Sequence, residues 1–417
     1  MHRHADIAII GGGIVGMSCA YELARQSDLR IVLFDKQNPA SGTTGGSAGV
    51  ICLHDMGELY AQLTLLGYAR IQQLRHDYGF NYHPWGSLQV AYEPADFPPP
   101  LSPYQVRFGS DAPGDIYRQE ILDTASLIER YPWIRPERVK GGVFYPNQGF
   151  IDPYELVALY ERLALETGRV EIHRNTPVLQ IRTQGEQITT LVTRRGPWSV
   201  GQVLNAGGPW GAKVAALAGS ELALTPQRIQ VCVATAFDDG VEGAALTGLP
   251  ESVGDEGVWC RGELGGMLLF GQHHHVTKPG YTVDPDYVNR VNDPGYPDAV
   301  ATVYRRFWHL PHSVFLNGWC CVYGTTEDGF PIISRDMRLA NFYHAVGMNG
   351  HGMTCHAGVA QATTELMLRG NTVMDLQPIL GRREQLNFGV LDAGRFEQGA
   401  LLDFTLQDTS ARAARIT

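Results

Sequence analysis

Charged residues are scarce in this sequence, and positive charge is not concentrated in any segment. Asp, Glu, Lys and Arg make up 18% of the 417 residues, and the formal net charge is −10. The chain has no basic block of the kind that binds nucleic acid or anionic membranes. It also has no apolar run of the roughly 18 residues that a transmembrane helix needs. We therefore expect no nucleic-acid partner and no transmembrane segment, and peripheral membrane contact stays open.

Cysteines are few and scattered. They are Cys19, Cys52, Cys232, Cys260, Cys320, Cys321 and Cys355. No pair has the Cys-x-x-Cys spacing of a zinc site, and the usage is typical of reduced thiols in a cytoplasmic protein. The run His273–His275 favours a solvated turn over a metal site, because neighbouring side chains on a strand point to opposite faces. The N-terminal segment has no signal-peptide cleavage site, so we expect it in the mature protein.

Glycine, in contrast, is abundant, with 48 of 417 residues, about 12% against a usual level of about 7%. Gly11, Gly13 and Gly16 lie between the apolar run Ile7–Ile10 and a helical stretch Met17–Gln26. This order of strand, glycine turn and helix allows a pyrophosphate to approach the helix N-terminus. Asp35 follows the next apolar stretch, where it can accept hydrogen bonds from an adenosine ribose. The pattern predicts a dinucleotide site and does not choose between NAD and FAD.

A second glycine-rich loop, Ser41–Val50, combines hydroxyl groups with bare backbone and precedes a helix expected from about Asp55 to Tyr78. Such a loop can wrap a second anionic or heterocyclic group. The turn, Asp35 and this loop together resemble the start of the FAD-dependent D-amino-acid oxidase and sarcosine oxidase superfamily. Later segments resemble the same family in the same order, so that the resemblance covers roughly residues 5–390. These segments are Gly141–Pro153, Trp319–Pro331 and Gly347–Met353.

The last of these segments opens a second helix, which we expect to end at about Arg369. A second glycine-rich helix start, far from the first, suits FAD, because a helix N-terminus can stabilise negative charge on a reduced flavin. NAD would leave this feature unexplained. FAD is therefore the expected cofactor.

The expected fold class is α/β, or α+β, in a two-domain flavoprotein. A Rossmann-like FAD-binding domain is joined to a discontinuous, mainly antiparallel β-sheet substrate domain, indicated by short alternating strands with Pro and Gly turns. We expect the FAD-binding domain at 1–82, 141–224 and 318–390, the substrate domain at 83–140 and 225–317, and a C-terminal tail at 391–417.

The resemblance also implies which residues bind FAD, with main chain near Val178 meeting adenine. The expected cofactor-binding residues are Gly11, Gly13, Ile14, Val15, Gly16, Asp35, Lys36, Thr43, Thr44, Ser47, Ala48, Gly49, Val50, Val178, Ala206, Gly207, Cys321, Asn349, Gly350, His351, Gly352 and Met353. Cys321 resembles the cysteine through which sarcosine oxidase bonds its flavin, which implies a thioether. A buried, unmodified thiol is the alternative. Gly46 stands where other relatives carry a flavin-linking histidine.

Substrate recognition departs from the family pattern, because the cationic positions of relatives correspond here to Tyr323, Cys52 and Thr354. Arg261 is the best remaining partner for a substrate carboxylate, and a surface salt bridge is its alternative role. His351 is expected either to border the flavin or to serve the structure. The catalytic candidates are therefore Tyr323, Arg261 and His351.

The resemblance implies an enzyme that passes hydride to FAD from the carbon next to an amine, giving an imine. The expected substrate is an amino acid or a secondary or cyclic amine. One alternative is an FAD enzyme of the same fold that oxidises a non-carboxylate amine or a C–OH group. Another is a flavin-carrying subunit of a hetero-oligomeric dehydrogenase. The lysine of sarcosine oxidases is replaced around Leu269, so O2 and a quinone or protein acceptor both stay open, as do homo- and hetero-oligomers.

Overall fold

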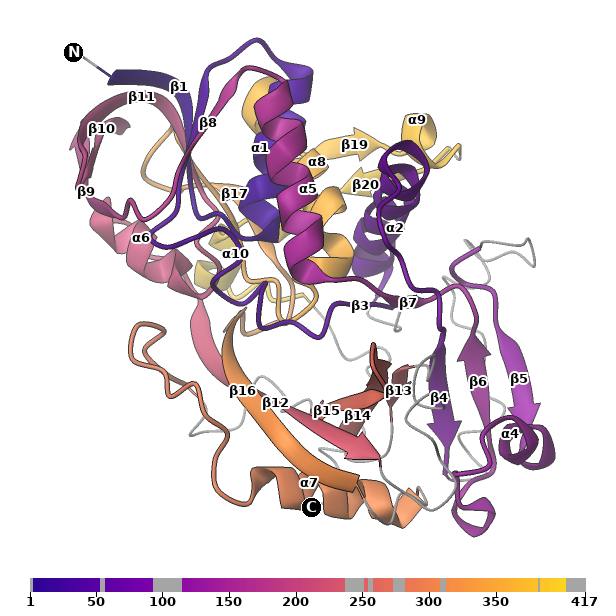
Figure 1. Cartoon of the computed structure of the whole chain (residues 1–417). Helices are drawn as coiled ribbons and strands as arrows, with labels where there is room; N and C mark the ends of the chain where they lie inside the picture. The colour runs from indigo at the N-terminus through magenta and orange to yellow at the C-terminus, as the bar shows by residue number, and fades with distance from the viewer. Residues whose placement is uncertain are drawn as a thin grey trace.

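The computed structural model describes residues 3–52, 57–92, 115–236, 251–253, 258–272, 282–307, 313–381 and 383–402. Two eight-stranded sheets dominate the structure (Figure 1). The first has the order β17-β18-β11-β1-β2-β8, with β10 and β9 added beside β11. Its strands are β1 (Arg3–Ile10), β2 (Ile31–Phe34), β8 (Val170–His173), β9 (Val178–Gln184), β10 (Gln187–Thr193), β11 (Gly196–Asn205), β17 (Ile332–Arg335) and β18 (Phe342–Val346).

The centre of this sheet is parallel and is covered on both faces. Strands β18, β11, β1, β2 and β8 run in one direction. Ile7 and Ile9 of β1 are buried among side chains of the helical layer, whereas Ala8 and Ile10 are buried in a separate apolar cluster on the other face. Continuous apolar runs of this kind suit strands that are buried on both sides. The helical layer consists of α1 (Ile14–Gln26), α2 (Glu58–Tyr78), α5 (Pro153–Glu166) and α8 (Gly352–Arg369), and α6 (Gly211–Leu217) contributes to the second cluster.

The second sheet has the order β16-β12-β15-β14-β13-β4-β6-β5. All neighbouring strands are antiparallel except β13 and β4, which confirms the expected mainly antiparallel sheet. Its strands are β4 (Ser87–Ala91), β5 (Glu120–Asp123), β6 (Gly141–Tyr145), β12 (Thr225–Ala236), β13 (Glu251–Val253), β14 (Val258–Glu263), β15 (Met267–Gln272) and β16 (Ser313–Thr325). The helices α4 (Thr124–Arg130) and α7 (Tyr296–Phe307) lie beside this sheet (Figure 1).

The described residues also form two small sheets, two short α-helices and three 3-10 helices, the last at Pro136–Arg138, Gly208–Trp210 and Gly389–Leu391. The sheets and α-helices are β3 (Val50–Ile51) with β7 (Gly149–Phe150), β19 (Val373–Asp375) with β20 (Gln385–Asn387), α9 (Gln377–Leu380) and α10 (Gly394–Glu397).

Two strands belong to the second sheet although all or part of their sequence lies in the ranges expected for the FAD-binding domain. The strand β6 pairs with β4 and β5, and β16 pairs with β12, so both belong to the second sheet although 141–224 and 318–390 were assigned to the FAD-binding domain. Part of the expected tail packs on the body of the protein, because Arg395 of α10 binds the buried carboxylate of Asp328. The division into two domains stays a prediction.

Candidate cofactor and active site

The first glycine turn is closed by contacts that leave no room for side chains. Gly11 has a φ of +115°, and a Cβ there would lie 2.3 Å from the Ala206 carbonyl oxygen. A Cβ at Gly16 would lie 1.9 Å from the Gly11 oxygen. Gly12 donates its N–H to Asp35 Oδ2 at 2.7 Å, which fixes the acidic side chain beside the turn. Gly13 then caps α1 without a side-chain hydrogen bond, and the N–H groups of the first turn beyond Ile14 are available to an anion.

The loop 41–50 folds over this helix N-terminus. The Ile14 N–H donates to Thr44 Oγ1 at 3.1 Å, and the Thr43 hydroxyl donates to the Val322 carbonyl oxygen of β16. On the other side of the loop, the Trp319 indole N–H donates to the Gly46 oxygen at 3.0 Å. The loop is thus held between α1 and the second sheet, as expected for a segment that covers a ligand.

The second glycine turn begins α8. Asn349 and Gly350 have φ values of +49° and +90°, and a Cβ at Gly350 would lie 2.6 Å from the Tyr323 ring. The Asn349 side chain accepts the Thr326 N–H at 2.9 Å and donates to Thr326 Oγ1 at 3.1 Å. This pair of bonds holds the non-glycine residue in its left-handed conformation, so that the turn can present the N-terminus of α8.

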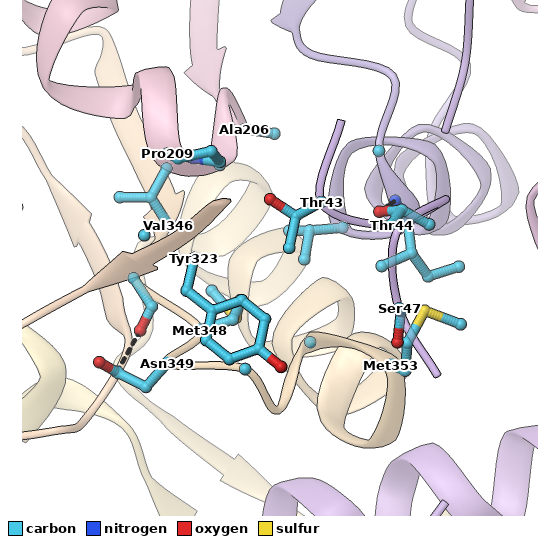
Figure 2. A pocket seen from close by; sticks show the side chains of 18 of the residues that line it. Thr43, Thr44, Ser47, Ala206, Pro209, Tyr323, Val346, Met348, Asn349 and Met353 are labelled. Atoms are coloured by element: carbon cyan, nitrogen blue, oxygen red, sulfur yellow. Dashed lines mark hydrogen bonds between the residues drawn. The ribbon is translucent and has the colours of Figure 1, made fainter. Parts of the chain in front are cut away.

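Both glycine turns open onto one pocket with about 630 Å³ of empty space. Figure 2 shows Thr43, Thr44 and Ser47 on one side of it, Asn349 and Val346 on the other, and Tyr323 between them. The predicted residues that line the pocket are Gly13, Ile14, Val15, Thr43, Thr44, Ser47, Ala206, Tyr323, Asn349, Gly350, Gly352 and Met353. Two helix N-termini, far apart in the sequence, therefore share a single cavity.

Further lining residues were not predicted, namely Gly208, Pro209, Gly324, Ala345, Val346, Gly347 and Met348. The structural signal for two of them was available, because Ala345 and Val346 end the parallel strand β18. Ligands of open α/β sheets bind at the carboxyl ends of the strands. Gly208 and Pro209 follow β11 and Gly324 lies in β16, and the packing of these distant segments is not encoded locally. Gly347 and Met348 follow β18, in the segment Gly347–Met353 that resembles the family.

Other predicted cofactor-binding residues lie outside the lining itself. They are Gly11, Gly16, Asp35, Lys36, Ala48, Gly49, Val50, Val178, Gly207, Cys321 and His351. Gly11 and Gly16 shape the turn, as described above. Val178 begins β9, and Lys36 pairs with Asp286 at 2.6 Å. His351 caps α8 and packs edge-on against Tyr60, with ring centroids 5.2 Å apart.

Cys321 lies on the same face of β16 as Tyr323 and packs against the early loop. A Cβ at Gly46 would lie 2.5 Å from the Cys321 Cβ and 3.4 Å from its Sγ. The thiol is buried, and burial raises its pKa to about 12, so the protonated form prevails at neutral pH. The thioether to flavin stays a prediction.

Arg261 is buried, and its guanidinium group is held by the protein. It donates to the Ala48 and Gly262 carbonyl oxygens at 2.8 and 2.7 Å, and to Glu263 Oε2 at 2.8 Å. Its charge also lies 4.1 Å from the centroid of the Phe150 ring. These contacts favour a role in fastening the early loop to β14 over a role as a substrate anchor, and the expected alternative of a surface salt bridge does not fit its burial.

No group of three or more His, Cys, Asp and Glu side chains in the described ranges is arranged to hold a metal ion. The run His273–His275 lies outside the described residues. None of the helices in the described part of the chain has the length and apolarity to cross a bilayer.

The residues of the pocket fit FAD. The Cβ-free position Gly13 leaves space at the N-terminus of α1, where only Thr44 Oγ1 approaches within 4 Å of an added Cβ. The N-terminus of α8 borders the same cavity through Gly352 and Met353. One helix can hold a pyrophosphate and the other can stabilise an anionic ring, which are the two requirements of a flavin dinucleotide.

Comparisons with known proteins agree with this geometry. Residues 6–366 match the protein family described as FAD dependent oxidoreductase. Human mitochondrial dimethylglycine dehydrogenase is 24% identical over 393 residues, which cover 89% of this chain and 43% of that protein. Monomeric sarcosine oxidase from Bacillus sp. strain NS-129 is also 24% identical, over 93% of this chain and 98% of the oxidase.

Solved structures share the fold. The crystal structure of L-proline dehydrogenase from P. horikoshii superimposes with a TM-score of 0.78 and 21% identity, covering 96% of this chain and 99% of that one. This chain spans less than half the length of the human dimethylglycine dehydrogenase that it matches. The family match nevertheless extends over most of the chain and confirms the resemblance. This protein therefore belongs to the FAD-dependent oxidoreductase family, and its cofactor is FAD.

Proposed function

We propose that this protein oxidises an amine, removing hydride from the carbon next to nitrogen to give an imine. The observation that carries the proposal is the shared pocket of the two helix N-termini, into which Tyr323 projects (Figure 2). By their names, the relatives act on dimethylglycine, sarcosine and L-proline. Each of these compounds has a C–H bond next to a secondary or tertiary amine, which supports the same bond as the reacting centre here.

The chain's own residues supply binding, orientation and electrostatics. FAD, when bound, supplies the hydride acceptor. The first N–H groups of α8 then stabilise negative charge that develops in the pocket. The Tyr323 hydroxyl orients the substrate amine, and the ring is held in place by its contact with Gly350. No protein nucleophile is needed for this chemistry.

We consider two classes of substrate, amino acids and amines without a carboxylate. One observation favours the second class. The first group is secondary or cyclic amino acids, as the relatives' names suggest. Among the described residues that line the pocket, however, none is Lys, Arg or His, and Arg261 is engaged elsewhere. A cluster on the second sheet that packs against Ala48 of the early loop is apolar and includes Val231, Trp259 and Leu269. This surface suits an amine without a carboxylate, which is our second candidate.

The test uses matched pairs of amines. The FAD-loaded protein is mixed without oxygen with sarcosine or dimethylamine, and with L-proline or pyrrolidine, while the oxidised-flavin absorbance is followed. The proposal predicts bleaching by at least one member of a pair, and the preferred member decides whether the carboxylate is recognised. Bleaching by hydroxy acids alone would contradict amine oxidation. Subsequent admission of air measures the rate of reoxidation, and slow reoxidation would indicate a quinone or protein acceptor in place of O2.

A further inference from the structure

A cluster of charged side chains lies near the pocket. It connects Lys36 and α6 with the segment 282–293. We call Lys36, Trp210, Lys213, Asp284 and Asp286 the clasp. Lys36 follows the Asp35 of the first glycine unit, and Lys213 belongs to α6. The two aspartates belong to the segment 282–293, between β15 and α7. In Figure 1 this orange segment passes beside α6.

Three donors converge on one carboxylate at the centre of the clasp. Asp286 Oδ1 accepts from Lys36 Nζ at 2.6 Å and from the Trp210 indole N–H at 2.7 Å, and Oδ2 accepts from Lys213 Nζ at 2.6 Å. Lys213 also pairs with Asp284 at 2.5 Å. The Lys36 ammonium group lies 3.8 Å from the centroid of the Trp210 ring. Burial alone would raise the pKa of Asp286, but the hydrogen bonds from Lys213, Lys36 and Trp210 lower it, so the carboxylate stays ionised.

The clasp lies next to residues that line the pocket and next to the first glycine unit. Trp210 directly follows Gly208 and Pro209, which line the pocket. Its ring packs against the early loop, since a Cβ at Gly42 would lie 3.3 Å from it. Lys36 adjoins Asp35, which is bonded to the glycine turn. The contacts of Asp286 therefore hold the turn 284–287 beside the first glycine unit, whereas Arg228 of β12 holds the part from Asn289 to Asp293.

We propose that Asp286 latches the turn 284–287 over the adenosine end of the FAD site, and that the latch must open before FAD leaves. Such a latch differs from a purely structural surface pair because breaking it changes the rate at which FAD leaves. The side chains of Lys36, Lys213, Asp284 and Asp286 are between 38% and 46% exposed, so dissolved ions reach them. Salt then weakens the latch and speeds the loss of FAD.

The experiment measures FAD release from the full chain, in the Cys321→Ser background so that no thioether can retain the flavin. FAD-loaded protein is diluted, and the rise of free-flavin fluorescence gives the release rate at about 50 mM and about 1 M NaCl. In low salt, Asp286→Asn should release FAD about five-fold faster than the parent, the scale of a lost ion-pair network. The parent should approach the Asp286→Asn rate in high salt, and the rate of the variant should change little.

Asp28→Asn is the matched control, because it removes the exposed Arg169–Asp28 pair with the same change of charge. It should release FAD at the parent rate. Equal release rates of Asp286→Asn and the parent would overturn the latch. Faster release from Asp28→Asn would also overturn it, because the effect would then follow from the change of net charge alone. Thermal unfolding of the FAD-free proteins should give the same midpoint for all three; a lower midpoint for Asp286→Asn would show a general folding role and also overturn it. Amine oxidation is measured separately, so its failure leaves this result unaffected.

Discussion

Substitutions at two glycines of the first turn should have different effects on stability and on FAD affinity. An added Cβ would meet backbone at 1.9 Å at Gly16, but at Gly13 it would meet only Thr44 Oγ1 at 3.2 Å. We expect Gly13→Ala to keep the thermal midpoint of the FAD-free protein and to bind FAD at least about ten-fold more weakly, or about 1.4 kcal/mol, because the methyl group enters the pocket. Fluorescence titration of the FAD-free protein with FAD measures the affinity.

Gly16→Ala is the comparison for that experiment. It should lose both FAD affinity and about 1–3 kcal/mol of stability, since α1 must move away from the turn. Wild-type FAD affinity in Gly13→Ala would show that the pocket at α1 does not receive the cofactor.

The adjacent thiols Cys320 and Cys321 offer a matched test of covalent attachment. The two point to opposite faces of β16, and Cys320 contacts the Arg228 guanidinium group at 3.0 Å, away from the early loop. If the thioether forms, acid precipitation leaves the yellow colour in the pellet for the wild type and for Cys320→Ser, and in the supernatant for Cys321→Ser. Colour in the supernatant of the wild type would show that Cys321 forms no thioether to the flavin.

The buried imidazole of His356 should make the stability of the folded protein depend on pH. The ring is buried in α8, donates Nδ1–H to the Met353 oxygen at 2.7 Å and accepts the Tyr160 hydroxyl at 2.9 Å. Burial lowers its pKa to about 4 from 6.5. Between these values the unfolded chain binds a proton that the folded chain does not, so stability falls as the pH drops.

At pH 5 this residue should cost about 1.6 kcal/mol relative to pH 6.5. His356→Gln should therefore show a shallower fall of the thermal midpoint between these two pH values. Identical slopes would mean that His356 is not neutral in the folded protein. Losses from Asp336, whose pKa is lowered to about 2 by His344 and Ser220 against the effect of burial, belong to lower pH.

At the scale of elements, the C-terminal helix α10 braces the start of α8. Arg395 donates to both carboxylate oxygens of Asp328, at 2.7 and 3.1 Å, and to the Phe330 oxygen at 2.9 Å. The same Phe330 oxygen accepts the Thr326 hydroxyl at 2.7 Å, and Thr326 holds Asn349 at the pocket. The brace thus connects the last described segment to the second glycine turn through buried polar groups.

Arg395→Met should destabilise the protein by about 3–5 kcal/mol, because the buried Asp328 carboxylate loses its cation. The exposed pair of Arg369 and Glu365 supplies the control, and Arg369→Met should cost less than about 1 kcal/mol. Thermal unfolding with and without FAD measures both effects. Equal, small losses in the two variants would contradict the brace.

Across the whole molecule, local structure could be predicted from the sequence, whereas contacts between distant segments could not. The strand, the glycine turn and α1 follow from residues within one short stretch, and so does the capping of α5 by Asp152, whose side chain accepts the Tyr154 and Glu155 N–H groups. The contacts of Lys36 with Asp286 and of Arg261 with Ala48 could not be predicted, because each joins segments more than two hundred residues apart along the chain. The contact of Arg261 with Ala48 is not visible in the sequence, and the role of Arg261 as a substrate anchor stays an untested prediction.

The central claim is that one ligand reaches from the α1 turn to the α8 turn. A crystal structure of the purified protein with its retained cofactor tests this directly. We expect a flavin dinucleotide with its pyrophosphate at Gly13 and its ring system at Gly352. A nicotinamide dinucleotide in the groove, or a flavin whose ring lies away from the α8 turn, would contradict it.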